Sequence, residues 1–265
     1  MIKEPFSDYK NRTELNASRL KIALNSANEF ELSGLDGYIA KPKSKEMGLG
    51  DAAHCFILEP EKFDGVFVVR PEGFDGRTKA GKEWNEENGH KAIISSEDFL
   101  FCQAMRWRMD NHQVARQFLP ENGAKTEVTV LGSVHGWSAK ARFDMLTDEG
   151  VIGDLKTTKA ETPDEFIREI LIYHYDLSAH FYRMIQSEYE DLPDFFFVVL
   201  STSRWQLWVI RLTDLSELVQ SGARKIERAF ENINRMMEAK ALKNPYGLVD
   251  KPIIDTRARW ELEKY

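Results

Sequence analysis

The stretch from residue 126 to residue 159 constrains the fold most, because it reads as three short strands. Its segments TEVTVLG, WSAKARFDM and VIGDLKT contain β-branched and apolar residues in partial alternation, which is typical of strands. The polar turn Thr147-Asp148-Glu149-Gly150 separates the last two segments. We therefore predict a hairpin centred on Glu149, in which residues about equally far from Glu149 face each other.

In that hairpin Asp144 lies opposite Asp154. Strand side chains alternate between the two faces, so Lys156 shares the face of Asp154, and Arg142 joins it. Two carboxylates directly across a strand pair repel each other, and a cation between them removes the repulsion. Oxygen ligands of this kind suit Mg²⁺ or Mn²⁺. A lysine beside such a metal can help deprotonate a water molecule and stabilise charge on a phosphate.

An aspartate followed after about ten residues by Asp-x-Lys is the pattern of the PD-(D/E)xK nucleases. Here the first element is Phe143-Asp144, without the proline, and the second is Asp154-Leu155-Lys156. Because Asp-x-Lys is common by chance, the alternative on these residues alone is an exposed charged hairpin that binds no metal.

Composition places the chain among ordinary globular proteins, with 42% hydrophobic and 30% charged residues in a length of 265. No apolar run approaches the ~20 residues that span a bilayer, and the opening residues lack the apolar stretch of a secretory signal. Cys55 and Cys102 are expected to be free thiols of a cytoplasmic protein, and two cysteines cannot hold an iron–sulfur cluster.

The formal net charge is −7, which excludes a broadly basic nucleic-acid-coating protein. It does not exclude a nuclease, because such an enzyme needs positive potential only along the path of its DNA.

The order of predicted elements indicates one α/β domain over residues 1–265, with a central mixed sheet flanked by helices. A mainly helical part (about 1–120) precedes the core (about 121–240) and an irregular tail. Residues 1–17 are expected to be extended or irregular. Beyond the three strands, we predict helices over 18–30, 47–63, 95–112, 163–189 and 213–240, a short helix over 111–118, and strands over 65–71, 195–200 and 205–212.

Three groups of residues outside the hairpin have two interpretations each. Ser18 is either a simple helix N-cap or, with Arg19 and Lys21, part of a phosphate-binding helix start. The segment from Arg77 to Lys82 is either an exposed loop and helix or a flap that faces DNA, and the basic loop 41–45 is either a linker or a nucleic-acid contact. His54 is either a core residue or a metal ligand carried by a slim helix.

With these pieces placed, the chain resembles the RecE-type exonucleases (exonuclease VIII family) of phages and prophages, within the PD-(D/E)xK superfamily. The resemblance extends from about Ser18 to Trp260. Its most specific segments are Gly50-Asp51-Ala52-Ala53-His54 with Leu58-Glu59-Pro60, Arg77-Thr78-Lys79-Ala80-Gly81-Lys82, Arg142-Phe143-Asp144, Gly153-Asp154-Leu155-Lys156-Thr157-Thr158, and the aromatic stretch from Tyr173 to Tyr182.

The resemblance implies a metal site with one or two Mg²⁺ ions, for which Mn²⁺ substitutes. By position, His54, Asp144, Asp154 and the Leu155 carbonyl are the metal ligands, and Lys156 is the catalytic lysine. Glu127 matches an acidic position that reaches a second ion through water. DNA contacts are predicted for Ser18, Arg19, Arg77, Lys79, Lys82, Arg142 and Tyr182.

The family resemblance further implies a 5′→3′ exonuclease that digests linear double-stranded DNA and leaves 3′ single strands for recombination. It implies no ATP requirement, a homo-oligomeric ring of three or four chains, and a strand-annealing partner. The alternatives are an endonuclease on the same core and a non-catalytic DNA-binding or assembly module. One departure concerns Ser178, which stands one turn before Tyr182 where relatives often carry glutamine.

Overall fold

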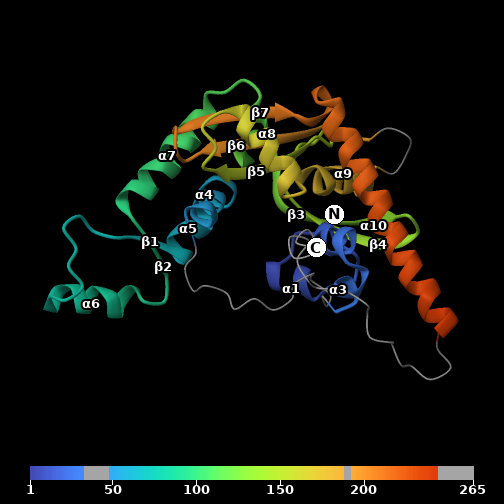
Figure 1. The fold of residues 1–265 in the computed structure, drawn as a ribbon. Coiled ribbons are helices and arrows are strands. Elements are labelled where there is room, and N and C mark those ends of the chain that lie inside the picture. The colour runs from blue at the N-terminus through green and yellow to red at the C-terminus, as the bar shows by residue number, and fades with distance from the viewer. Residues whose placement is uncertain (33–47, 188–191, 244–265) are drawn as a thin grey trace, which may run out of the picture.

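The computed structural model describes residues 1–32, 48–187 and 192–243, and its centre is a five-stranded mixed sheet (Figure 1). The strand order is β3-β4-β5-β6-β7, in which only β5 and β6 pair in parallel. The strands are β3 (Lys125–Val134), β4 (Trp137–Leu146), β5 (Ile152–Thr158), β6 (Phe195–Ser201) and β7 (Gln206–Arg211). The predicted α/β class with a mixed sheet flanked by helices is therefore confirmed.

Helices pack on both faces of this sheet, and β6 is buried between them. Phe195, Phe197 and Val199 enter one apolar cluster, whereas Val198 and Leu200 enter the other, as expected for a continuous apolar strand. The first cluster includes residues of α2 (Ala17–Asn25), α3 (Ala27–Leu32), α8 (Pro163–Ile172), α9 (Tyr175–Gln186) and α10 (Ser216–Lys243). The second includes residues of α4 (Leu49–Leu58), α5 (Pro60–Val66), α7 (Ser96–Asp110) and the 3-10 turn η1 (Ala115–Phe118).

The register of the β4–β5 hairpin is the predicted one. Met145 pairs with Gly153 and Leu146 with Ile152, so residues equally far from Glu149 face each other. In the neighbouring β3–β4 ladder, pairing proceeds from Lys125↔Leu146 to Val134↔Trp137 and omits one residue of β3, Glu127. Glu127 has a left-handed backbone with φ 53°, which is uncommon for a residue other than glycine.

The expectation that the first residues are extended or irregular was wrong for residues 6–11. They form α1 (Phe6–Asn11), and isolated bridges join Ile2 to Thr129 and Leu15 to Ala139 on the sheet. This order comes from partners more than 120 positions away, which no local sequence pattern records.

Two predicted helices are each broken into a pair. The helix expected over 163–189 stops at Ile172 and restarts at Tyr175, because His174 between them adopts a left-handed conformation with φ 53°. The helix expected over 18–30 breaks at Ser26, whose backbone is extended. Its N-cap is Asn16, whose side chain accepts a hydrogen bond from the Arg19 N–H, so Ser18 is not the cap.

Several boundaries also moved. Pro60 opens a new helix that continues to Val66, so strand β1 is confined to Phe67–Val69, where it pairs with β2 (Ala92–Ile94). Thr213 and Asp214 lie in the 3-10 turn η3 (Leu212–Asp214) before α10. A further 3-10 turn, η2 (Pro120–Asn122), precedes β3. By contrast, α7 begins where the predicted helix over 95–112 does, with Ser95 as its N-cap.

The basic loop 41–45 and the tail 244–265 lie outside the described residues. Among the helices that are described, none combines the length and apolar character needed to cross a membrane.

Candidate active site

Three carboxylates lie side by side on three adjacent strands. The pairs Thr126↔Met145 and Val128↔Phe143 place Glu127 across from Asp144, and the β4–β5 register, extended by one residue, places Asp144 across from Asp154. The Asp144 carboxylate accepts a 2.8 Å hydrogen bond from the backbone N–H of Leu155. The predicted facing aspartates are therefore present, and Glu127 extends the row to three.

Helix α4 brings His54 to this row. Its Nε2 lies 2.8 Å from the carbonyl oxygen of Leu155 on β5. Gly50 makes the close approach possible, because a Cβ atom at that position would lie 2.9 Å from the Thr157 hydroxyl. The slim helix expected around His54 is thus present, and its close packing on β5 lets the imidazole reach that strand.

His54, Glu127 and Asp144 offer one ligand atom each, all within 4.8 Å of one another. Opposite ligands of an octahedral Mg²⁺ are about 4.2 Å apart and neighbouring ones about 3 Å, so only a small closure is needed. The separation of 2.8 Å between His54 Nε2 and the Leu155 carbonyl oxygen also matches neighbouring ligands. The donor set of one imidazole, two carboxylates and a carbonyl suits a divalent cation.

Burial and mutual repulsion perturb the ionisation of these ligands. The pKa of Asp144 is raised to about 7, first by burial and then by the charge of Asp154. Burial and the charge of Asp144 also raise the pKa of Glu127, and burial together with the nearby Lys156 lowers the pKa of His54. Carboxylates held this close favour a bound cation, which compensates their charge.

Lys156 contacts the carboxylate of Asp154, and its Nζ also lies 3.4 Å from the Leu155 carbonyl oxygen. Burial opposes its positive charge, but Asp154 and then Asp144 outweigh that cost and raise its pKa. Lys156 is therefore a cation at the side of the carboxylate row. Asp154 is directed to this lysine and is not one of the three residues of the compact ligand group.

Tyr175 and Lys21 complete the surroundings of Lys156. Two ammonium groups lie over the Tyr175 ring, with Lys156 Nζ 5.3 Å and Lys21 Nζ 5.2 Å from its centre. Burial, with a contribution from Lys156, lowers the pKa of Lys21 to about 8. The sequence marks Tyr175 only as part of an aromatic stretch, because its position depends on the helix break at His174.

Two cavities open on the row of carboxylates. His54, Leu155 and Lys156 line a large cavity of about 630 Å³. Asp144 and Tyr182 line a small cavity of about 230 Å³. Phe6, Glu127 and Arg142 line both cavities and so form their boundary.

The predicted DNA contacts divide into those near the site and those away from it. Ser18, Arg142 and Tyr182 line the small cavity, and Arg142 Nε donates a 2.6 Å hydrogen bond to Glu127. Arg19 lines a different cavity beside the β3–β4 turn, and its guanidinium lies over the Phe30 ring. Ser178 lines neither of the two cavities at the carboxylates.

Arg77, Lys79 and Lys82 are exposed residues at or in α6 (Lys79–Asn88), which projects beyond β1 and β2, away from the five-stranded sheet (Figure 1). Arg77 pairs with Asp75, and Lys79 lies 3.8 Å from Glu83. These three basic residues are not part of the active-site cavities.

A family model and one solved structure agree with this architecture. A family model described as a PDDEXK-like domain of unknown function, DUF3799, matches residues 16–246. No curated protein matches the chain. The crystal structure of a Eubacterium rectale protein that carries the provisional name of exonuclease superposes with a TM-score of 0.59 at 15% identity, over 99% of this chain and 98% of that one. A phage-related exonuclease from Haemophilus somnus 129PT has 11% identity and a TM-score of 0.35, over 85% of this chain and 96% of that one.

Proposed function

Because the chain belongs to the PDDEXK-like DUF3799 family, we propose that it is a metal-dependent nuclease that hydrolyses phosphodiester bonds of DNA. One observation carries the proposal. His54, Glu127 and Asp144 form a compact ligand group at the sheet, and the lysine of the Asp-x-Lys element stands beside it. A charged hairpin without function would not require a histidine from a separate helix, nor the glycine that admits it.

The residues divide the chemistry between them. His54, Glu127, Asp144 and the Leu155 carbonyl would hold Mg²⁺ or Mn²⁺. Such an ion neutralises phosphate charge and lowers the pKa of a bound water molecule. Lys156 is a point charge directed at the attacking water and the phosphate oxygens, and Asp154 keeps it charged and in place. In the overall reaction water adds to phosphorus, the bond to the leaving ester oxygen breaks, and that oxygen is protonated.

In its finer form the proposal is a RecE-type exonuclease that degrades linear duplex DNA from 5′ to 3′ and leaves 3′ single strands for recombination. Its support is the set of sequence segments shared with that group. Residues of the most specific segments, including His54 and the Asp154–Lys156 element, line the large cavity or contact its walls. An endonuclease on the same core is the second candidate, because the catalytic residues would be the same.

We also propose that three or four copies form a closed ring, with a single-strand annealing protein as a partner. The net charge of −7 supports a ring, because DNA affinity depends on Lys and Arg that neutralise phosphates. A ring can retain DNA by enclosing it even when each contact is weak. The proposed location is the cytoplasm, and the free thiols of Cys55 and Cys102 suit a reducing compartment.

An end-labelled linear duplex, incubated with and without Mg²⁺, tests the proposal. We expect stepwise loss of nucleotides from the 5′ end only with Mg²⁺, and no digestion of a covalently closed circle. Cutting of the closed circle would favour the endonuclease. A protein that degrades neither substrate would leave only the non-catalytic DNA-binding or assembly module. Lys156→Ala is the matched control for contaminating nucleases.

A further inference from the structure

We propose that Phe6 is a stacking platform for the terminal base of the DNA strand in the active site. The N-terminal segment, residues 1–16, holds the ring at that place. This inference rests on the proposed nuclease function, because it assigns a DNA-reading role at the same site. It names a contact to the nucleobase, whereas the catalytic residues act on phosphate and water.

The N-terminal segment is attached to the sheet at both ends. Near its start, Ile2 and Thr129 exchange two backbone hydrogen bonds of 2.8 and 3.0 Å. Near its end, the Leu15 N–H donates to Ser138 and its carbonyl accepts from the Lys140 N–H. The segment is thus a loop with two fixed ends, and α1 lies between them.

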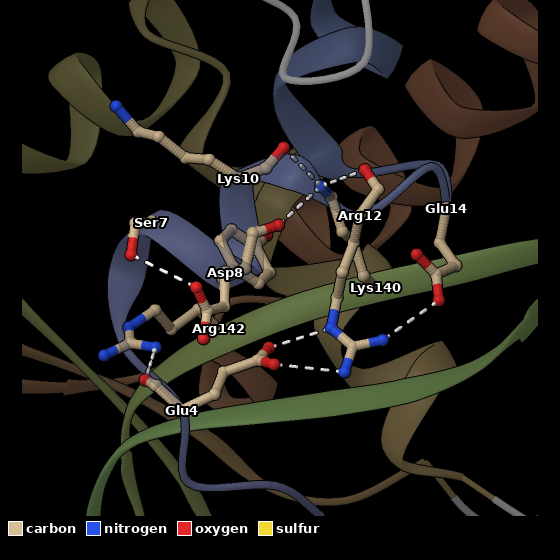
Figure 2. A network of polar contacts seen from close by, with 9 residues as sticks. Glu4, Ser7, Asp8, Lys10, Arg12, Glu14, Lys140 and Arg142 are labelled. Carbon is tan, nitrogen blue, oxygen red and sulfur yellow. Dashed lines mark hydrogen bonds and ion pairs between the residues drawn. The ribbon is translucent and has the colours of Figure 1, made fainter.

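Lys140, on strand β4, binds the middle of the segment through its side chain. Its side chain is fully buried, and Nζ donates hydrogen bonds of 2.8 Å to the carbonyls of Tyr9 and Arg12 (Figure 2). These carbonyls lie at the C-terminal end of α1, where partial negative charge favours a cation. A buried ammonium group is costly unless its donors are satisfied, so this arrangement strongly favours one position for α1.

Two arginines hold the segment in place: Arg12 bonds to Glu4 within the segment, and Arg142 links Glu4 to the candidate site. Arg12 donates two hydrogen bonds, of 2.9 and 3.0 Å, to the carboxylate of Glu4 (Figure 2). Arg142, which contacts Glu127 of the ligand group, donates a 3.0 Å hydrogen bond to the Glu4 carbonyl (Figure 2). The position of Phe6, two residues after Glu4, is therefore set relative to the metal ligands.

Phe6 itself is not a core residue. It is 53% exposed, although it is a large apolar side chain on a well-anchored helix. It lines both the large and the small cavity, so a strand that passes from one to the other can contact the ring. Tyr9 supports the ring in a stacked arrangement, with centroids 6.1 Å apart and planes at 13°.

The charges around Phe6 identify the occupant as a nucleotide. Lys10 Nζ is 4.7 Å and the Arg142 guanidinium 5.7 Å from the centre of the ring. An aromatic ring with cations placed over it can combine stacking of a base with positive charge for the adjoining phosphates. If an apolar surface of another protein docked on Phe6 instead, it would remove water from these two cations without pairing their charges, which is unfavourable.

The test is a binding cycle that changes both the protein residue and the base. Duplexes carry either a normal or an abasic nucleotide at the 5′ or the 3′ terminus, and affinity is measured by fluorescence anisotropy in CaCl₂. For wild-type protein we expect binding to weaken about tenfold when the base at one of the two termini is removed. Phe6→Ala should bind the normal duplex about tenfold more weakly and be indifferent to the missing base.

Three controls keep the result specific. Phe6→Trp should restore both the affinity and the sensitivity to the base, whereas Phe6→Leu, apolar but without a π face, should restore neither. Leu100→Ala removes another exposed apolar side chain, 56% exposed on α7, and should behave as wild type. Thermal unfolding checks that every variant is folded.

Phe6→Ala protein that remains as sensitive to the abasic terminus as wild type would overturn the inference. A Phe6→Ala chain that changes from oligomer to monomer would also overturn it, because the ring would then be a contact between copies. Wild-type protein that shows the coupling in CaCl₂ but cuts no DNA in Mg²⁺ would contradict the nuclease function while supporting Phe6 as the stacking residue. Failure of wild-type protein to bind any duplex would contradict both.

Discussion

The carboxylate of Asp144 accepts a 2.8 Å hydrogen bond from the backbone N–H of Leu155, the residue between the aspartate and the lysine of the Asp-x-Lys element. One oxygen of Asp144 is therefore occupied by the strand that carries Lys156. The two halves of the motif are joined directly, and a variant that removes only the charge can retain that bond.

We predict that Asp144→Asn and Asp154→Asn each reduce DNA digestion at least 100-fold while the fold is retained. The asparagine oxygen at position 144 can still accept from the Leu155 N–H, so the loss reports the charge. Because the substitution at Asp144 also relieves repulsion between facing carboxylates, metal-free Asp144→Asn should melt at or above the wild-type temperature. Asp154→Asn removes the charged partner of the buried Lys156 and should melt below it. Digestion by either variant at a near wild-type rate would remove that residue from the site.

Lys156→Ala should lose catalysis by about 100- to 1000-fold and keep its metal affinity, because the lysine acts on water and phosphate. Isothermal titration with Mn²⁺ measures the affinity, and the single-turnover rate measures the catalysis. The exposed Lys159→Ala, three residues further on, is the matched control and should match wild type in both. If metal affinity collapsed together with activity, Lys156 would instead be needed to build the ligand group.

Metal specificity should follow ligand geometry. Mg²⁺ and Mn²⁺ should support cleavage, whereas Ca²⁺ should support DNA binding without turnover, because it takes more ligands at longer distances and misplaces the attacking water. Parallel anisotropy and cleavage assays in each chloride salt measure the difference. Rapid digestion in Ca²⁺ alone is the contrary outcome.

The metal-free protein should become less stable as the pH rises. The pKa of Asp144 in the folded state is about 7, above its ordinary value of 3.8, so the folded state binds more protons than the unfolded chain between these values. Stability is then lost as the pH rises through this window, by at most about 4 kcal/mol, and levels off above pH 7. The raised pKa of Glu127 acts in the same direction.

Urea unfolding in EDTA at pH 5 and pH 8 measures this effect, with Asp144→Asn as the comparison. The variant should show a clearly smaller difference between the two pH values. Added Mg²⁺ should stabilise wild type more at pH 8 than at pH 5, because protonated Asp144 is a poor ligand. Equal stability of the wild type at both pH values would mean that Asp144 is ionised throughout.

Assembly is tested by light scattering at micromolar concentration and moderate salt. We expect the mass of three or four chains, since closed cyclic symmetry satisfies head-to-tail interfaces without filament growth. A monomer mass, combined with distributive digestion under DNA excess, would contradict the ring and leave the active-site proposal intact.

The sequence was most informative where structure is decided by nearest neighbours in the chain. The turn at Glu149 determines the β4–β5 register, and the apolar run of β6 identifies a strand buried on both faces. These features depend on periodicity and turn chemistry, which are visible in a window of ten residues. The facing of Asp144 and Asp154 followed from the same register.

The remaining features depend on contacts between distant segments. His174 breaks a continuous apolar pattern, so α9 begins as a separate helix. Helix α10 packs directly on the first turn of α9 at Gly222, where a Cβ atom would lie 2.4 Å from the Asp176 carbonyl oxygen. The left-handed Glu127 and the ordered N-terminal segment have no local pattern either. Lys140 looked like one more polar residue on a strand, because its partners lie about 130 positions earlier.

The contacts of the buried Lys140 also bear on when residues 1–16 attach to the sheet during synthesis. Residues 1–16 leave the ribosome long before strands β3 and β4, yet their anchors Thr129, Ala139 and Lys140 lie on those strands. The segment must wait, unattached, until the hairpin has formed, and such long-range closure is a slow step of folding. Residues 1–16 are therefore made before the strands that hold them but reach their final place only after those strands have formed, and the wall of the cavities beside Phe6 is completed at that late step.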